Sequence, residues 1–357
     1  MALLCLFACA SGLCQSYPPE FATSQAYAKG DQVQYAGNTF RALGPVSPSS
    51  NYPTKDYSDW EMIYVRANTS LIIGTANSFP TLQIAWNYIQ NTKVADGAYL
   101  HLVIAAPNTG HKEPLPVGYS ESFSGGFCLN HSSGANIALV STIAGGATLN
   151  FTGGTSGFFL SGGHTFGGIF GNALLTLKGV VSASPTYGVQ VNDSSHLEAL
   201  DQLTIDTFQE GVEAGPGSSI NADAVTITDV VDAAEALYGG YISFTGLNLD
   251  GGTISDNGLV AIDGEITALS ATFTNVPTAV YSKDHGFIDV SSSTITGSGY
   301  GILCQFRGHA KAEDATISGS ALDDVSVSGN SSVDAIDATY TTSADYGNSA
   351  IFTDSTS

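Results

Sequence analysis

The sequence predicts an all-β protein built mainly as a parallel β-helix, with about 22–24 residues in each coil. One observation is composition: 41 glycines and only 12% charged residues, a mixture in which long helices are disfavoured. The other is a phrase of alternating apolar residues that recurs at a fixed interval along the second half of the chain. An apolar content of 43% is sufficient for a packed core.

The charge balance and the missing motifs narrow the possible partners. The 32 acidic residues outnumber the ten basic ones, for a formal net charge of −22, which repels phosphate backbones and anionic lipid. The five cysteines form no CxxC pair, and no phosphate-binding glycine loop or dinucleotide fingerprint occurs. The sequence therefore predicts no nucleic-acid partner, no membrane insertion, no cofactor and no metal site.

Residues 1–16, "MALLCLFACASGLCQS", are expected to form a cysteine-rich anchoring peptide. The apolar run is too short to span a membrane. As a helical turn it would place Cys5 and Cys9 on one face, and Cys14 follows, so disulfides could lock a joint with a partner. The alternative is a secretory signal that is cleaved, with Ala8 and Ala10 resembling a cleavage site.

Residues 17–65 read as a small three-stranded antiparallel module. Val33 and Tyr35 alternate with polar residues, a Gly-Asn turn follows, Phe40 continues the alternation, and a third strand surrounds Trp60. The stretches "AYAKGDQVQYAGNTFRA" and "DWEMI" resemble the small carbohydrate-binding modules of chitinases, which also occur near the N-termini of phage tail proteins. The chain departs from those modules in "LGPVSPSS", where they carry an exposed aromatic pair.

The aromatic residues of this module allow two interpretations. Tyr27, Tyr35 and Trp60 either form its small core, together with Phe40, or present a sugar-binding face, as the resemblance implies. Because the aromatic pair of the family is missing here, the core interpretation is favoured and ligand binding remains the alternative.

The stretch "SFPTLQIAWNYIQ" predicts the one helix of the chain. Ser78 is the expected N-cap, Pro80 suits the first turn, and Leu82, Ala85, Trp86 and Ile89 recur at helical spacing. This helix, followed by the strand-like "LHLVIA", resembles the entry of the pectate-lyase-like superfamily of right-handed, single-stranded parallel β-helices. There a helix covers the open end of the first coil, where unpaired strand edges need protection.

The repeat defines the β-helix, predicted over residues 66–338. Each coil starts with an apolar residue, and the intervals between starts are 23, 22, 24, 22, 22 and 23 residues; these starts are Leu197, Ile220, Ile242, Ile266, Ile288, Ala310 and Val333. Residues 134–195 read as earlier, glycine-rich coils, residues 106–133 as a long loop, and residues 339–357 as a C-terminal cap or tail. Cys304 falls on a column expected to be buried, so it reads as a core residue rather than a reactive thiol.

One cluster in the repeats carries candidate catalytic residues. Aligned coils place His285 and Arg307 at the same position of consecutive coils, and Asp263 and Glu265 end the coil before them. An acid, a histidine and an arginine on one edge could bind or cleave a sugar. Turns of solenoids also collect polar residues, so a solvated ladder of opposite charges is the favoured interpretation, and no catalytic residue is assigned.

The order of parts resembles a bacteriophage tail fibre or tailspike: an anchor, a small module, then a capped β-helix. The resemblance implies a homotrimer on the virion surface, attached to other virion proteins through residues 1–16, with the β-helix facing host cell-surface polysaccharide. We expect a structural and glycan-adhesive appendage rather than an enzyme. The alternatives are a polysaccharide depolymerase, either hydrolase or lyase, and a secreted bacterial carbohydrate-binding adhesin.

Overall fold

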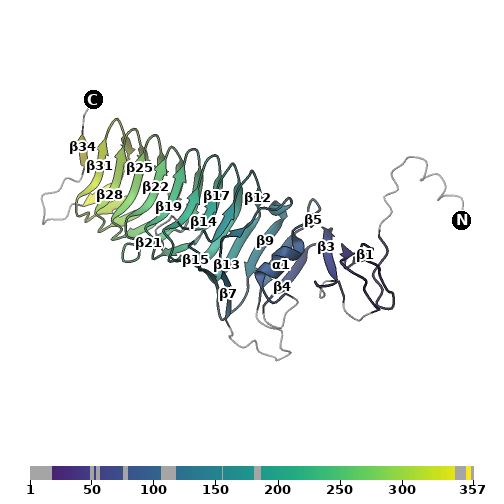
Figure 1. The fold of residues 1–357 in the computed structure, drawn as a ribbon. Coiled ribbons are helices and arrows are strands. Elements are labelled where there is room, and N and C mark those ends of the chain that lie inside the picture. The colour runs from purple at the N-terminus through teal and green to yellow at the C-terminus, as the bar shows by residue number, and fades with distance from the viewer. Residues whose placement is uncertain are drawn as a thin grey trace, which may run out of the picture.

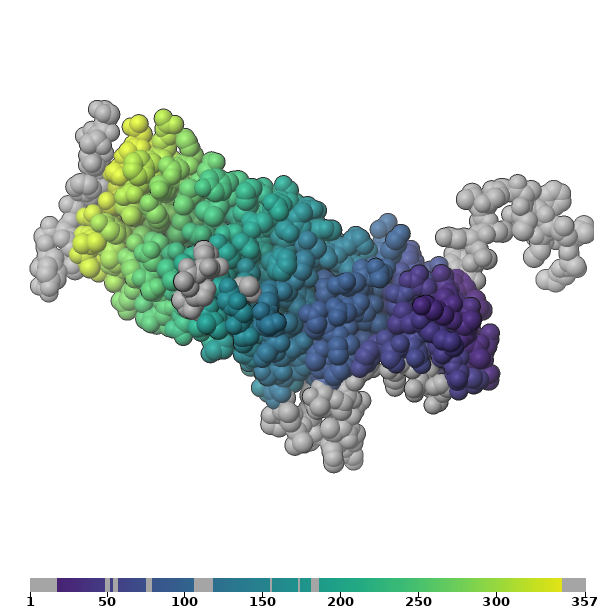
Figure 2. All heavy atoms as spheres, in the orientation of Figure 1, coloured from purple at the N-terminus to yellow at the C-terminus, as the bar shows by residue number. Residues whose placement is uncertain are grey.

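The computed structural model describes residues 18–48, 52–53, 57–74, 79–105, 118–154, 156–180, 186–341 and 351–354. Figure 1 shows a small sheet near the N-terminal end, a short helix beside it, and a stack of β coils that extends away from both. The space-filling view shows the same elongated body, in which the chain advances from one end to the other (Figure 2). Segments far apart in the sequence are therefore far apart in space, as expected for a solenoid.

The small sheet contains four strands: β1 (Gln32–Tyr35), β2 (Asn38–Ala42), β3 (Trp60–Val65) and β5 (Lys93–Val94). The first three are antiparallel neighbours. The fourth, which follows the helix, pairs in parallel with β3 and was not expected from the sequence. Strand β5 lies in the part of the chain that was predicted to belong to the β-helix. Its pairing with β3 therefore joins the small sheet to the solenoid.

Helix α1 (Leu82–Ile89) is the predicted cap helix. Its N-cap is Thr81, whose Oγ1 accepts a hydrogen bond from the Ile84 N–H at 3.2 Å, so the prediction of Ser78 as N-cap is wrong. Ser78 itself lies outside the described residues. Thr81 has extended backbone angles, so the helix begins after it. Pro80 therefore precedes the first turn and is not part of it.

Both ends of α1 are fixed to the first coils. The Glu121 carboxylate accepts hydrogen bonds from the N–H groups of Leu82 (2.7 Å) and Gln83 (3.1 Å), where negative charge favours a helix N-terminus. At the other end, His131 Nε2 lies 2.8 Å from the carbonyl oxygen of Ile89, and burial lowers the pKa of this histidine. Trp86 on the buried face packs 5.5 Å from the ring of Phe127. The helix therefore covers the open end of the core.

One large sheet of twenty parallel strands runs the length of the solenoid. Its strands are β4 (Thr69–Ile73), β6 (Leu100–Ile104), β7 (Tyr119–Phe123), β9 (Ile137–Ser141), β10 (Ala147–Phe151), β12 (Thr165–Phe166), β13 (Gly168–Lys178), β15 (His196–Asp206), β17 (Ser219–Asp223), β18 (Thr226–Thr228), β20 (Tyr241–Thr245), β21 (Asn248–Asp250), β23 (Glu265–Leu269), β24 (Thr272–Thr274), β26 (Phe287–Asp289), β27 (Thr294–Thr296), β29 (His309–Lys311), β30 (Thr316–Ser318), β32 (Ser332–Asp334) and β33 (Thr339–Thr341).

A second sheet of ten parallel strands closes the coils on the other side. Its strands are β8 (Phe127–Cys128), β11 (Phe158–Leu160), β14 (Tyr187–Val191), β16 (Glu210–Ala214), β19 (Asp232–Leu237), β22 (Asn257–Ile262), β25 (Thr278–Lys283), β28 (Tyr300–Gln305), β31 (Asp323–Ser328) and β34 (Ile351–Asp354). Since β34 pairs in parallel with β31, this part of the predicted C-terminal cap or tail continues the solenoid. Strands β7 and β8 lie within the segment predicted as a long loop, so that prediction is wrong for residues 119–123 and 127–128.

The pairing register confirms the predicted repeat. Every predicted coil start pairs with the next one along the chain, from Leu197 with Ile220 to Ala310 with Val333. A second column pairs Leu249, Phe273, Ile295 and Ile317 in the same way, and all four side chains are fully buried. Stacking identical positions at the strand spacing of about 4.8 Å gives one continuous core, the arrangement of a parallel β-helix.

Candidate functional site

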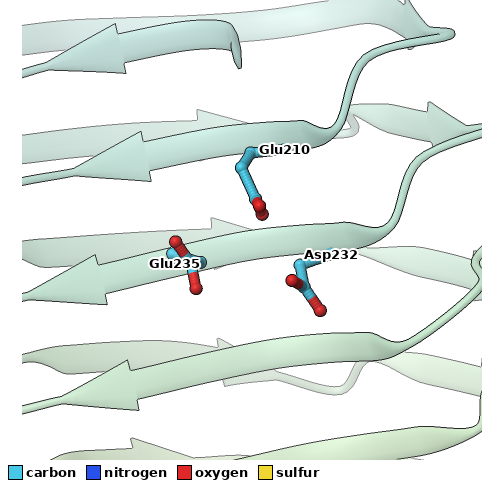
Figure 3. A group of neighbouring side chains, drawn as sticks. All are labelled: Glu210, Asp232 and Glu235. Carbon is cyan, nitrogen blue, oxygen red and sulfur yellow. The ribbon is translucent and has the colours of Figure 1, made fainter. Parts of the chain in front are cut away.

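Three carboxylates from two consecutive coils meet on the ten-stranded sheet; we call them the carboxylate cluster (Figure 3). Glu210 begins β16, while Asp232 and Glu235 belong to the neighbouring strand β19. One oxygen of each carboxylate lies within 4.8 Å of an oxygen of the other two. Glu210 and Asp232 are register partners, which explains why they lie side by side.

The local sequences of β16 and β19 explain part of this arrangement. In "EGVEA", Val212 and Ala214 are core residues, so Glu213 between them lies on the opposite face of the strand, and "DAAEAL" places Glu235 in the same way one coil later. Gly211 permits the two strands to approach closely at the cluster. A Cβ atom there would lie 2.4 Å from the carbonyl oxygen of Ala233.

The hydrogen bonds around the cluster are unevenly distributed. Asp232 accepts two from Asn257, one from its backbone N–H at 2.9 Å and one from Nδ2 at 2.7 Å. The neighbouring Glu213 accepts from Gln190 Nε2 at 2.9 Å. Glu210 is only 7% exposed, and its Oε2 is buried with no hydrogen-bond partner. An unpaired buried carboxylate oxygen is costly, so this site calls for a proton or a cation.

The pKa values follow from burial and from like charge. Burial, reinforced by the charges of Glu235 and Asp232, raises the pKa of Glu210 to about 9. Burial and the same kind of repulsion raise the pKa of Glu235 to about 7. The pKa of Asp232 is also raised by burial, against the opposing effect of the hydrogen bonds from Asn257. Within the described part of the chain, no lysine or arginine forms an ion pair with these carboxylates.

A groove of about 340 Å³ lies on the other, twenty-stranded sheet. The pairing of β15 with β17 shifts register between Leu197 and Leu200, which marks a β-bulge. The groove lies beside this bulge. Its lining includes one aromatic ring and several polar side chains: Phe170, Glu198, Asp201, Asn221, Asp223 and Thr245. An aromatic ring together with carboxylates and an amide is the kind of lining that binds sugar hydroxyls.

Two carboxylates of the groove are paired. Asp201 and Asp223 are register partners on adjacent strands, and Oδ1 of Asp201 is buried with no hydrogen-bond partner. Burial, and to a smaller extent the charge of Asp223, raises the pKa of Asp201. Two neighbouring carboxyl groups, one of them with a raised pKa, are the kind of pair that general acid and base catalysis on glycosides uses.

The residues predicted from the sequence lie on a different edge of the solenoid. Arg307 Nη1 lies 3.3 Å from His285 Nε2, and both exposed side chains come from left-handed turn positions. Asp263 and Glu265 are also exposed, and among the ion pairs of the described residues none joins either of them to His285 or Arg307. The structure thus brings the histidine and the arginine together without their acids, on an open turn.

The small sheet holds the predicted aromatic residues in unequal environments. Tyr27 and Trp60 are 5% and 1% exposed, and their rings meet edge to face at 5.2 Å in the core. Tyr35 is half-buried and stacks on the exposed Tyr52 at 5.0 Å. Ligand binding at this module stays a prediction, and of the three rings only that of Tyr35 is more than 5% exposed.

The cysteines also lie in different environments. The predicted anchor residues Cys5, Cys9 and Cys14 lie outside the described residues. Cys304 is fully buried, and burial raises its pKa to about 12, so its thiol is an unreactive core group. Cys128 is a half-buried free thiol.

Sequence reasoning overlooked both the carboxylate cluster and the groove. A signal for the cluster was present: Glu210 and Glu213 recur 22 residues later as Asp232 and Glu235. Acids at the same two positions of consecutive coils must lie on adjacent strands. The sequence held no comparable signal for the groove. The groove depends on a β-bulge, and no residue type in β15 predicts that bulge.

Comparison with family models, with curated proteins and with solved structures finds no match to this chain. Within the described residues, no helix has the length and apolar character needed to cross a membrane. The assignment of function therefore rests on the residues and geometry given above.

Proposed function

We propose that this chain is a structural and glycan-adhesive appendage, a fibre or spike, on the surface of a virus particle. The observation that carries the proposal is its directional architecture, with the small sheet and α1 at one end and a rigid stack of coils leading away (Figure 1). Residues 1–16 precede that end and serve as the anchor to other virion proteins. The proposal includes the right-handed winding and the homotrimer implied by the resemblance to tailspikes.

The groove on the twenty-stranded sheet is the adhesive surface in this proposal. It offers the ring of Phe170 for an apolar sugar face, and Asn221, Asp223 and Thr245 for sugar hydroxyls. The net charge of −22 and the carboxylates of the groove disfavour an acidic ligand. The expected ligand is therefore a neutral segment of a host cell-surface polysaccharide.

Attachment through the N-terminal peptide is tested by replacing Cys5, Cys9 and Cys14 with serine together. We expect the triple variant to detach from virus particles on mild heating without reductant, because the disulfides that constrain the joint are gone. Sedimentation of the particles followed by immunoblotting measures the retained fraction. Cys128→Ser is the matched control and should behave as wild type. Retention of the triple variant at the wild-type level would refute the disulfide anchor.

The paired Asp201 and Asp223 favour a second candidate, a polysaccharide hydrolase acting in the same groove. Protonated Asp201 would donate its proton to the glycosidic oxygen as the bond to the anomeric carbon breaks. The Asp223 carboxylate would activate the water, or attack the anomeric carbon itself. A hydrolase would release new reducing ends, whereas an adhesin would bind the same glycan intact.

Substitution of the pair separates adhesion from cleavage. If the groove is hydrolytic, Asp201→Asn should lower the release of reducing ends from host envelope glycan at least a hundredfold, since the acid contributes about 10²–10⁴-fold. Binding of the glycan, measured by sedimentation with cell envelopes, should persist. Asp250→Asn, which changes an exposed side chain outside the groove, is the control. Cleavage that survives Asp201→Asn but is lost on changing Asp263, Glu265, His285 and Arg307 would move the site to the turn.

A further inference from the structure

We propose that Glu210, Asp232 and Glu235 form a binding site for a hard divalent cation of the calcium type. The site is separate from the adhesive groove, which lies on the other sheet, so the proposal does not depend on the function proposed above. Its ligand atoms come from two consecutive coils, β16 and β19, and a bound cation would join them.

The first argument is the donor set. The three side chains offer only carboxylate oxygens, within 4.8 Å of one another, and Figure 3 shows Glu210 pointing from its strand toward the strand that carries Asp232 and Glu235. Calcium takes six to eight oxygen ligands in flexible geometry, and carboxylates can bind it through one or both oxygens, with water completing the shell. No histidine or cysteine belongs to the group, so a softer metal such as zinc is disfavoured.

The second, independent argument is the unpartnered oxygen of Glu210. Glu210 is only 7% exposed and its Oε2 lacks a hydrogen-bond donor, although two of the neighbouring acids, Asp232 and Glu213, accept hydrogen bonds. Asp232 is held by both donors of Asn257, and Glu213 by Gln190 and Asn192. These donors fix the neighbouring carboxylates in place and leave Glu210 Oε2 as the position for a ligand.

The third argument is electrostatic. Like charges directly opposite on adjacent strands destabilise a sheet, and here Glu210 faces Asp232 while Glu213 faces Glu235. Asp256 adds a fifth carboxylate to the field at Glu210. Because no lysine or arginine of the described residues pairs with them, a divalent cation supplies the missing positive charge.

The experiment uses the whole chain, freed of metal with a chelator and then titrated with Ca²⁺ alone at pH 8 by calorimetry. We expect one saturable site with a dissociation constant in the range of about 10⁻⁵–10⁻³ M and a higher unfolding temperature in the presence of Ca²⁺. Tb³⁺ provides a second readout, because Tyr187, the register partner of Glu210, lies close enough to sensitise its luminescence. Added Ca²⁺ should quench that signal by displacement.

Variants make the assignment specific. Glu210→Gln and Asp232→Asn should each weaken Ca²⁺ binding at least tenfold while leaving the circular dichroism spectrum unchanged. Glu198→Gln, an acid of the groove, is the matched control and should bind as wild type. Absence of saturable binding to folded wild type at millimolar Ca²⁺ would overturn the proposal. Equal binding by wild type, Glu210→Gln and Asp232→Asn would overturn it too, because the ion would then sit elsewhere. Loss of glycan adhesion is not an expected outcome for these variants.

Discussion

Replacement of Phe273 by alanine should lower the free energy of unfolding by about 3–5 kcal/mol, the usual cost of a large-to-small change at a fully buried aromatic residue. Phe273 is fully buried in β24 and lies between Leu249 of the preceding coil and Ile295 of the following one. The variant removes contacts in both directions and leaves a cavity between coils, which the neighbouring strands cannot close without losing their register.

The effect should extend beyond one coil. In a solenoid each repeat is stabilised mainly by its two neighbours, so a weakened coil separates the coils before it from those after it. Urea unfolding followed by circular dichroism would measure both the midpoint and the slope. A reduced slope, or a second transition, would report that the C-terminal coils unfold on their own.

Thr272→Ala provides the matched control, because Thr272 lies on the same strand with its side chain exposed. We expect this variant to change stability by less than about 0.5 kcal/mol, as is usual for a surface position. If Phe273→Ala and Thr272→Ala were equally stable, the column would not be the core that the register indicates.

The coils could be predicted from the sequence because the same position of every coil stacks in the core, so that position must be apolar in each coil. The starts Leu197, Ile220 and Ile242 could be placed from the sequence alone, since a change of one residue in register would turn each of them to solvent. Even the polar Ser293 fits its buried column. Its Oγ donates to the Ala268 carbonyl at 3.1 Å and accepts from the Ala271 N–H at 3.0 Å.

The turns were less predictable, because many of the residues that bend the coils are not glycine. The corner between two strands of a coil is Gly246 in one coil, but it is Ala224, Ser270, Ser292 and Asp314 in others, all four with φ between 49° and 59°. Only the Asp among these four commonly adopts the left-handed region. Stacking of the coils therefore overrides local preference at these corners, and single-residue propensities cannot identify them.

The candidate sites depended on information of the same non-local kind. His285 and Arg307 were correctly placed side by side, because both occupy the same turn position of consecutive coils. Their acids were not joined to them, because Glu265 sits at the start of a strand, where its register partner is Phe287 instead. The burial of Glu210, which is only 7% exposed, is a property of the packed coils and not of the local sequence.

Glu210→Gln should stabilise the metal-free chain at pH 9 by up to about 6 kcal/mol and have little effect at pH 4. The pKa of Glu210 is about 9 in the folded chain, against an ordinary value of 4.5. Between these two values the folded state keeps a proton that the unfolded state has released. Stability therefore falls as pH rises through this window, and the loss is complete above pH 9. Glutamine has the shape of the protonated acid but nothing to ionise, so the variant escapes the loss.

The groups that face Glu210 are all acidic or neutral: Glu213, Asp232, Glu235 and Asp256, with Tyr187 on the preceding strand. None of them can compensate for its ionisation, and burial raises the pKa of Tyr187 as well. Glu235→Gln should give a smaller gain, confined to pH values above about 5 and complete near pH 7, because the pKa of Glu235 is raised only to about 7.

Urea unfolding at intervals between pH 4 and pH 9, in the presence of a chelator, measures the difference between wild type and Glu210→Gln. Glu198→Gln is the control for loss of one negative charge, since the chain as a whole carries a formal charge of −22. A wild-type stability that stayed level or rose from pH 5 to pH 9 would contradict a buried, protonated Glu210. Repeating the series with Ca²⁺ should remove most of the wild-type loss at high pH, because an ion bound to the ionised carboxylates replaces the proton, and should leave Glu210→Gln nearly unchanged.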